Sequence, residues 1–213
     1  MRRGAPRVHI VADLPFLTYQ ASDEQAVLSA GQLLKEAGAD AVKLEGGAAM
    51  ASRVAAIARS GIPVVGHIGL TPQSSGLLGG FKVQGQEVTS AKAVIDDALA
   101  IEAAGAYMLV VEAIPAKLAG LITERVGIPV IGIGAGSDCD GQVLVWHDLL
   151  GIEDRHAARF VKRYANLAGE IRTAIGAFAG EVRSGAYPAP EHSFKMKGSV
   201  LDELRAQLGP PSS

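Results

Sequence analysis

With 213 residues, 48% of them hydrophobic, the chain can bury one substantial core, which favours a single domain over residues 1–213. Its 20 basic and 22 acidic residues give a formal net charge of −2 without a basic stripe or polybasic cluster, so we expect no nucleic acid and no membrane among its partners. The single cysteine, Cys139, excludes an intramolecular disulfide and a cysteine-based zinc site, and no apolar run approaches the roughly 20 residues that span a bilayer, which together favour the cytoplasm.

One pattern occurs twice in the chain. A helix-like segment ends at Gly-Ala, a short apolar run follows, and the run ends in a glutamate, in residues 38–45 (GADAVKLE) and 105–112 (GAYMLVVE). Each copy is followed by a helical stretch and the phrase Gly-Ile-Pro-Val, at residues 61–64 and 127–130. Apolar runs of this length that alternate with helices are typical of parallel β/α units buried on both faces. A charged residue at the carboxyl end of such a strand is where barrel enzymes place their chemistry.

The alternation of strands and helices continues along the chain. The first helix is predicted to start at Ser22, with Gln25 placed as in a capping box, and to stop at Gly38. The predicted strands are residues 8–13, 41–45, 63–67, 107–112, 129–134 and 142–146, and the further helices are residues 49–60, 89–104 and 115–126. This alternation indicates an α/β fold. Because a closed (β/α)₈ barrel needs eight strands, we expect an incomplete barrel of six strands that lacks two β/α units at its amino end.

Two segments depart from the short repeat. Residues 69–87 form a long loop containing Gly, Gln and Ser, and loops beyond about 15 residues tend to be lids or binding loops, so we expect this loop to cover the site. Residues 155–183 are predicted as one long helix, or as two helices broken near Gly169 and Gly176, and residues 199–208 as a short terminal helix. We expect this C-terminal helical region, residues 155–208, to pack on the barrel or on a neighbouring subunit.

Titratable side chains stand at the ends of four consecutive predicted strands: Asp13, Glu45 with Lys43 two residues before it, His67 and Glu112. The two-residue period of a strand places Lys43 and Glu45 on the same face. Neighbouring strand ends lie about 5 Å apart, so the carboxylates of Asp13 and Glu45 could share one cation. Ligands that are all oxygen favour a hard ion, and Mg²⁺ before Zn²⁺.

Several phrases of the chain together resemble one known family. The family is 3-methyl-2-oxobutanoate hydroxymethyltransferase, which forms ketopantoate in pantothenate synthesis. The likeness runs from about Gly4 through Gly151, and more loosely through the region of Phe194 and Lys195 to the end. It rests on the phrases VADLPFLTYQ, GADAVKLEGG, GHIGLTPQS, GGFKVQG and GIGAGSDCDGQVLVWHDLLG, in this order.

The resemblance implies a one-carbon transferase. Its reaction moves a hydroxymethyl group from 5,10-methylenetetrahydrofolate to 3-methyl-2-oxobutanoate and gives 2-dehydropantoate, on the route to coenzyme A. The resemblance also implies the (β/α)₈ barrel of the phosphoenolpyruvate mutase-like superfamily, one Mg²⁺ per subunit, and self-association into a homo-oligomer, which is a decamer in the family.

The same resemblance assigns roles to the residues at the strand ends. Asp13 and Glu45 match the carboxylates of the metal site, and Asp13 also touches substrate. Lys43 matches a residue that contacts the keto acid. Glu112 matches the proton acceptor, and His67 a supporting histidine of the pocket.

The chain also departs from the family pattern. The family's TAYD-like strand and GDS-type strand end, which contribute an aspartate and a serine to the site, have no match here. We therefore expect a shortened chain, through a misplaced start or a genuine truncation, and an impaired fragment or a non-catalytic subunit stays an alternative. A further alternative is a sibling Mg²⁺-dependent lyase acting on 2-oxo acids without folate. Such enzymes usually carry a KKCGH-type lid motif, which this sequence lacks.

Overall fold

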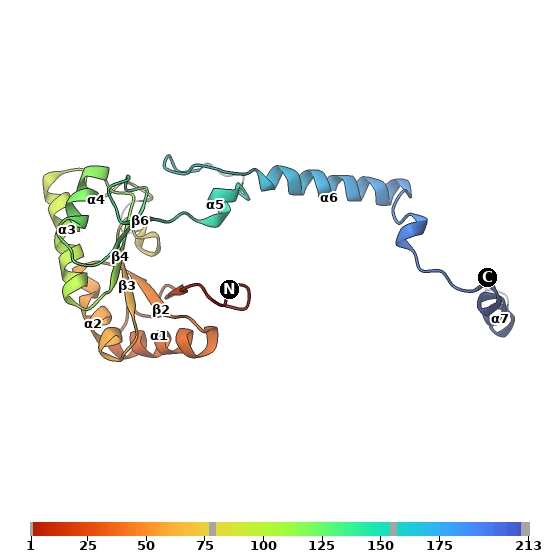
Figure 1. Ribbon diagram of the computed structural model, residues 1–213, viewed down its shortest axis with the longest axis horizontal. Helices are drawn as coiled ribbons and strands as arrows, with labels where there is room; N and C mark the ends of the chain where they lie inside the picture. The colour runs from red at the N-terminus through yellow and green to blue at the C-terminus, as the bar shows by residue number, and fades with distance from the viewer. Residues whose placement is uncertain (1, 77–79, 154–156, 210–213) are drawn as a thin grey trace. The chain divides into compact units, whose positions relative to one another are not determined.

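A computed structural model of the protein describes residues 2–76, 80–153 and 157–209 (Figure 1). These residues group into two compact units. The first unit extends to Val145 and also includes Ala157–Lys162, and the second holds the remaining described residues from Trp146 onward. Among the described residues, no helix is both long and apolar enough to cross a membrane.

The first unit is built on one parallel sheet of six strands, as the alternation of the sequence predicts. Each strand pairs with the next one along the chain, in the order β1-β2-β3-β4-β5-β6. Sequential parallel strands joined by helices are the arrangement found in (β/α)₈ barrels, so the fold is α/β and corresponds to an incomplete barrel. The strands are β1 (Val11–Asp13), β2 (Ala41–Glu45), β3 (Val64–Gly69), β4 (Met108–Glu112), β5 (Val130–Ile133) and β6 (Gly141–Gln142).

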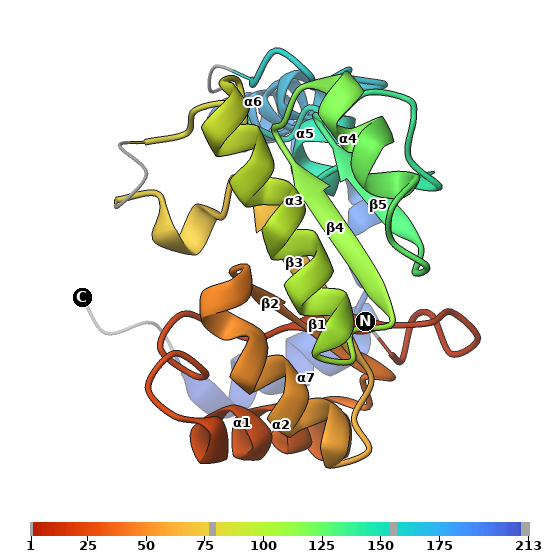
Figure 2. The same ribbon diagram turned by 90° about the vertical axis from the view of Figure 1, so that its left-hand side faces the viewer.

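Four helices lie on one face of this sheet (Figure 2). The start of the first helix follows from its sequence, since the Ser22 hydroxyl accepts a hydrogen bond from the Gln25 backbone N–H at 3.1 Å. The Gln25 side chain donates to the Leu17 carbonyl and does not accept from the Ser22 backbone N–H, so only half of the predicted capping box forms. The helices are α1 (Asp23–Ala37), α2 (Ala51–Arg59), α3 (Val88–Ala103) and α4 (Ala116–Thr123), with 3₁₀ turns η1 (Ala48–Met50) and η2 (Pro72–Ser74).

The helix-facing side of the sheet carries the hydrophobic core. Gly66 on β3 permits the closest approach, because a Cβ atom there would lie 2.3 Å from Cγ2 of Ile101 on α3 and 3.1 Å from Cδ1 of Leu109 on β4. The absence of a side chain at Gly66 therefore lets α3 pack directly on β3. The buried strand residues of this face are Val42, Leu44, Val64, Ile68, Leu109, Val111 and Val130.

The structure differs from the sequence prediction after β5. The strand predicted at residues 142–146 is reduced to the two residues of β6, and Trp146 begins a short helix, α5 (Trp146–Leu150). The helix predicted from residue 155 begins only at Leu167, because backbone hydrogen bonds from Tyr164 to Leu149 and from Ala168 to Gly151 hold the preceding segment against α5. The other elements of the second unit are α6 (Leu167–Ser184), which runs unbroken through its glycines, η3 (Pro190–His192) and α7 (Gly198–Leu208).

Candidate functional site

The register of the sheet gathers the five sequence-predicted site residues on the face opposite the helices. Asp13 pairs with Lys43, and Glu45 pairs with His67. Glu112 pairs with Gly69, two positions beyond His67 on β3. Because residues two apart on a strand point to the same side, all five side chains lie on one face, toward the carboxyl ends of β1 to β4.

Lys43 links the first two strand ends to the centre of the site. Its ammonium nitrogen lies 2.6 Å from Oδ1 of Asp13 and 3.4 Å from Nδ1 of His67. The Lys43 side chain is only 19% exposed, whereas that of Asp13 is 63% exposed. The cation therefore sits at the border between solvent and the buried histidine, where it can face an anionic ligand.

His67 lies between two carboxylates in the buried part of the site. Its side chain is 4% exposed, with Nε2 3.1 Å from Oε2 of Glu112 and Nδ1 3.8 Å from Oε1 of Glu45. Among the described residues, Nε2 is a buried side-chain atom without a hydrogen bond of acceptable geometry. A buried polar atom without a hydrogen bond costs about 1–3 kcal/mol, so a bound ligand that hydrogen-bonds Nε2 beside Glu112 would recover this cost.

A hydrogen-bonded group around Glu45 was not identified from the sequence. The Gln73 backbone N–H donates to Oε2 of Glu45 at 2.9 Å, and the buried Tyr19 hydroxyl donates to Oε1 of Gln73 at 2.8 Å. Burial is the main cause that raises the pKa of Tyr19 to about 12; the hydrogen bond with the Glu45 backbone opposes this shift, and the charges of Glu45 and Asp13 add to it. The hydroxyl thus stays protonated and remains a donor near neutral pH.

The backbone after Glu112 adopts an unusual conformation. Ala113 has φ of 47°, a positive value that is uncommon for a residue other than glycine and costs about 1–3 kcal/mol. Two hydrogen bonds maintain it, because the Ala113 N–H donates to the Ile133 carbonyl and its own carbonyl accepts from the Gln84 N–H, both at 2.9 Å. This conformation fixes the direction in which the chain leaves β4, directly after the glutamate.

In the loop predicted to cover the site, residues 69–87, the described part on each side of residues 77–79 contacts the site through a glutamine. Gln73 donates to Glu45, and Gln84 donates to the residue after Glu112. Residues 77–79, the middle of the predicted lid, lie outside the described residues. The two contacts attach both described parts of the loop next to the glutamates of the site.

The two predicted metal ligands provide oxygen atoms suited to a hard cation. Among the described residues, Oε1 of Glu45 accepts no hydrogen bond, since Nδ1 of His67 lies 3.8 Å away, and Asp13 keeps one oxygen beside the one that is paired with Lys43. No group of three or more His, Cys, Asp or Glu suited to a metal occurs within the described part of the chain. Mg²⁺ commonly binds through one or two carboxylates, with water and substrate completing the shell, so the donor set fits this ion.

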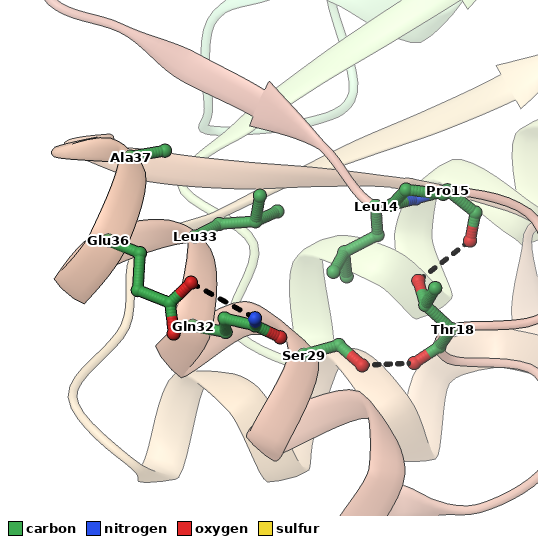
Figure 3. A pocket seen from close by; sticks show the side chains of 8 residues that line it. All are labelled: Leu14, Pro15, Thr18, Ser29, Gln32, Leu33, Glu36 and Ala37. Carbon is green, nitrogen blue, oxygen red and sulfur yellow. Dashed lines mark hydrogen bonds between the residues drawn. The ribbon is translucent and has the colours of Figure 1, made fainter.

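A cavity of about 280 Å³ lies between α1 and the segment that follows β1 (Figure 3). It is lined by residues of these two elements and by none of the five site residues. Ser29 on α1 donates to the Thr18 carbonyl at 2.8 Å, and the Thr18 hydroxyl donates to the Pro15 carbonyl at 2.7 Å (Figure 3). These bonds hold the segment that carries Tyr19 on the surface of α1.

Comparison with solved structures identifies distant neighbours. A crystal structure of phosphonopyruvate hydrolase matches 94% of this chain and 69% of its own, with a TM-score of 0.48 and 15% identity. A second structure of phosphonopyruvate hydrolase, in complex with oxalate and Mg²⁺, matches 94% of this chain and 72% of its own, with a TM-score of 0.47 and 15% identity.

Comparison with curated proteins identifies much closer relatives. The 3-methyl-2-oxobutanoate hydroxymethyltransferase of Clostridium acetobutylicum is 54% identical over 202 residues, which are 95% of this chain and 73% of that protein. The enzyme of the same name from Moorella thermoacetica is 55% identical over 193 residues, 91% of this chain and 72% of that protein. The family model described as ketopantoate hydroxymethyltransferase matches residues 1–190. The chain, with its six parallel strands and polar strand ends, therefore belongs to the ketopantoate hydroxymethyltransferase family of transferases.

Proposed function

We propose that this protein transfers a hydroxymethyl group from 5,10-methylenetetrahydrofolate to 3-methyl-2-oxobutanoate and forms 2-dehydropantoate. The relatives from Clostridium acetobutylicum and Moorella thermoacetica, which are 54% and 55% identical in sequence, are named 3-methyl-2-oxobutanoate hydroxymethyltransferase. The structural observation that carries the proposal is the position of Glu112, whose carboxylate lies 3.1 Å from the buried His67 on the face that also presents Lys43. A base, a buried polar partner and a cation on one face suit proton abstraction from an anionic substrate.

The first step in this proposal is the removal of the C3 proton of the oxo acid by Glu112. The electron pair of the C3–H bond moves toward the carbonyl oxygen and gives an enolate. Lys43 faces the substrate carboxylate and offsets part of its charge. Nε2 of His67 lies 3.1 Å from Oε2 of Glu112 on the buried side of this carboxylate, so the imidazole limits how far the carboxylate can turn away from the substrate.

A Mg²⁺ ion held by Asp13 and Glu45 would polarise the carbonyl of a bound 2-oxo acid and so stabilise the developing enolate charge. In the second step C3 forms a bond to the methylene carbon of the folate. The two carbon–nitrogen bonds of that methylene break, one water supplies the hydroxyl group, and the two folate nitrogens take the remaining proton of that water and the proton that Glu112 removed from C3. The loop of residues 69–87 would limit access of water to the enolate. Water would otherwise protonate the enolate at C3 and regenerate the oxo acid.

The proposal is tested by the exchange of the C3 proton in D₂O, without folate. The purified chain is incubated with 3-methyl-2-oxobutanoate and Mg²⁺, and ¹H NMR follows the methyl doublet, which becomes a singlet when C3 carries deuterium. We expect exchange with Mg²⁺, loss of exchange after chelation with EDTA, and recovery when excess Mg²⁺ is added. Methylenetetrahydrofolate should then yield 2-dehydropantoate.

The same assay separates the alternatives. A chain that catalyses no C3 exchange above buffer would contradict the proposal and support a non-catalytic subunit or impaired fragment. Exchange followed by cleavage of other 2-oxo acids, without product from the folate, would support the sibling lyase.

We also propose that the chain associates with copies of itself. The α6 helix carries an apolar stripe at spacings of four, three and four residues, which is the period of one helix face. The side chains of this stripe are 47–62% exposed, and this exposed fraction is larger than expected for an apolar helix face in a single chain without a partner. The stripe consists of Ile171, Ile175, Phe178 and Val182. Light scattering of the purified protein measures the assembly, and a monomer would contradict the proposal.

A further inference from the structure

The ends of strands β1 and β2 are joined by a hydrogen-bonded bridge whose two central residues, Tyr19 and Gln73, are not among the predicted site residues. Its centre is Gln73 in η2, which contacts both strand ends. The Gln73 backbone N–H donates to Oε2 of Glu45 at 2.9 Å. Its side-chain Nε2 donates to the carbonyl of Leu14, the residue after Asp13, also at 2.9 Å.

Tyr19 completes the bridge from the segment that follows β1. Its hydroxyl donates to Oε1 of Gln73 at 2.8 Å and accepts from the Glu45 backbone N–H at 3.2 Å. Tyr19 is only 1% exposed, so its position is set by packing as well as by hydrogen bonds. The side-chain amide of Gln73 therefore has both its carbonyl oxygen and its nitrogen engaged, and its orientation is determined.

This bridge determines the orientation of the Glu45 carboxylate. One oxygen is held by the Gln73 N–H, and the other is left without a hydrogen bond on the side of the site. The bridge also ties the position of Glu45 to the backbone one residue beyond Asp13. A cation shared by the two carboxylates requires both a free oxygen and a set separation of the strand ends.

We propose that Tyr19 and Gln73 are positioning residues, which hold the carboxylates of Asp13 and Glu45 in the arrangement that binds a divalent cation. The inference rests on the proposed function, since it assigns a cation to these two carboxylates. Neither Tyr19 nor Gln73 contacts the cation or the substrate. Partners that orient metal ligands typically contribute about 10–100-fold to metal affinity.

The test is the affinity for Mn²⁺ without substrate, measured by electron paramagnetic resonance of the free ion. Mn²⁺ is used because it shares the oxygen ligands of Mg²⁺. We expect Tyr19→Phe and Gln73→Ala each to raise the dissociation constant about tenfold. Tyr19→Phe removes the hydroxyl bonds to Gln73 and to the Glu45 backbone, and Gln73→Ala removes the side-chain bonds to Tyr19 and Leu14 while the backbone bond to Glu45 remains, so a folding defect in one variant leaves the other informative.

Tyr107→Phe and Gln32→Ala are the matched controls. The Tyr107 hydroxyl hydrogen-bonds His9 at 2.7 Å, next to the amino end of β4, and the Gln32 side chain bonds Glu36 on α1. Each control removes the same chemical group as its partner variant but leaves the carboxyl ends of β1 and β2 unchanged. We expect Tyr107→Phe to lower the thermal midpoint as Tyr19→Phe does, with unchanged Mn²⁺ affinity.

The outcomes distinguish this inference from the proposed function. Unchanged Mn²⁺ affinity in Tyr19→Phe and Gln73→Ala would overturn the inference, and so would an unsubstituted chain that binds no Mn²⁺. With either of these two results, C3 exchange by the unsubstituted chain would still support the proposed function. A third result is that both variants bind Mn²⁺ more weakly while the unsubstituted chain does not exchange the C3 proton. This result would support the positioning role and contradict the proposed function.

Discussion

Replacing Glu112 by glutamine is expected to slow the C3 exchange of 3-methyl-2-oxobutanoate by about 10²–10⁴-fold. Glutamine has nearly the same shape as glutamate but cannot accept the proton. The side chain lies on the same face as Lys43 and next to His67, away from the Asp13 and Glu45 carboxylates that are proposed to hold the cation. The substitution should therefore leave Mn²⁺ affinity within about twofold of the unsubstituted chain, an estimate in keeping with the small effect of changes outside a metal's ligand shell.

The matched control is Glu36→Gln, the same change on the exposed surface of α1, where the Glu36 carboxylate accepts a hydrogen bond from the Gln32 side chain. Its exchange rate should equal that of the unsubstituted chain. If Glu112→Gln retained full exchange with normal substrate affinity, another group would have to be the base, and His67 would be the first to replace in turn.

Replacing Leu109 by alanine is expected to lower the free energy of unfolding of the first unit by about 2–5 kcal/mol. Leu109 is fully buried on β4 and contributes to the core between the sheet and the helices. The substitution removes apolar contacts. It also leaves a cavity, because the backbone hydrogen bonds of β4 with β3 and with β5 prevent the strands from moving in to fill the space. Urea unfolding followed by circular dichroism measures the loss.

Leu121→Ala is the matched control, because Leu121 on α4 is 42% exposed. Its cost should stay within about 0.5 kcal/mol, the usual range of surface substitutions. Equal costs for the two variants would show that β4 is not packed as described, and the position of Glu112 at its end would then lose its structural support.

Much of the first unit is predictable because its signals are local. The strand predicted at residues 41–45 coincides with β2, since this short and mainly apolar run follows the glycine that ends a helix and is itself followed by two glycines. The end of α1 at Gly38 also follows from one residue, because its φ of 66° is readily adopted by glycine. The alignment of the polar strand ends then follows from parallel pairing of consecutive strands.

The chain after β5 was predicted less well for a corresponding reason. The sequence from residue 155 is compatible with a helix, and local propensity alone would start the helix there. In the structure the segment before Leu167 is instead held by backbone hydrogen bonds to α5, which residue-level propensity does not describe. Gly176 lies within α6 and does not interrupt it, because a single glycine costs a helix only about 1 kcal/mol.

The sequence by itself determined the parallel β/α order, the family, and which titratable residues stand at the strand ends, since all of these are written in short contiguous patterns. Only the tertiary structure decided how those residues contact one another. It places His67 between Glu45 and Glu112, and it joins Gln73 to residues 28, 54 and 59 positions away in the chain. No local pattern specifies such pairs, because they form only when packing of the helices on the sheet brings distant loops to the same strand ends.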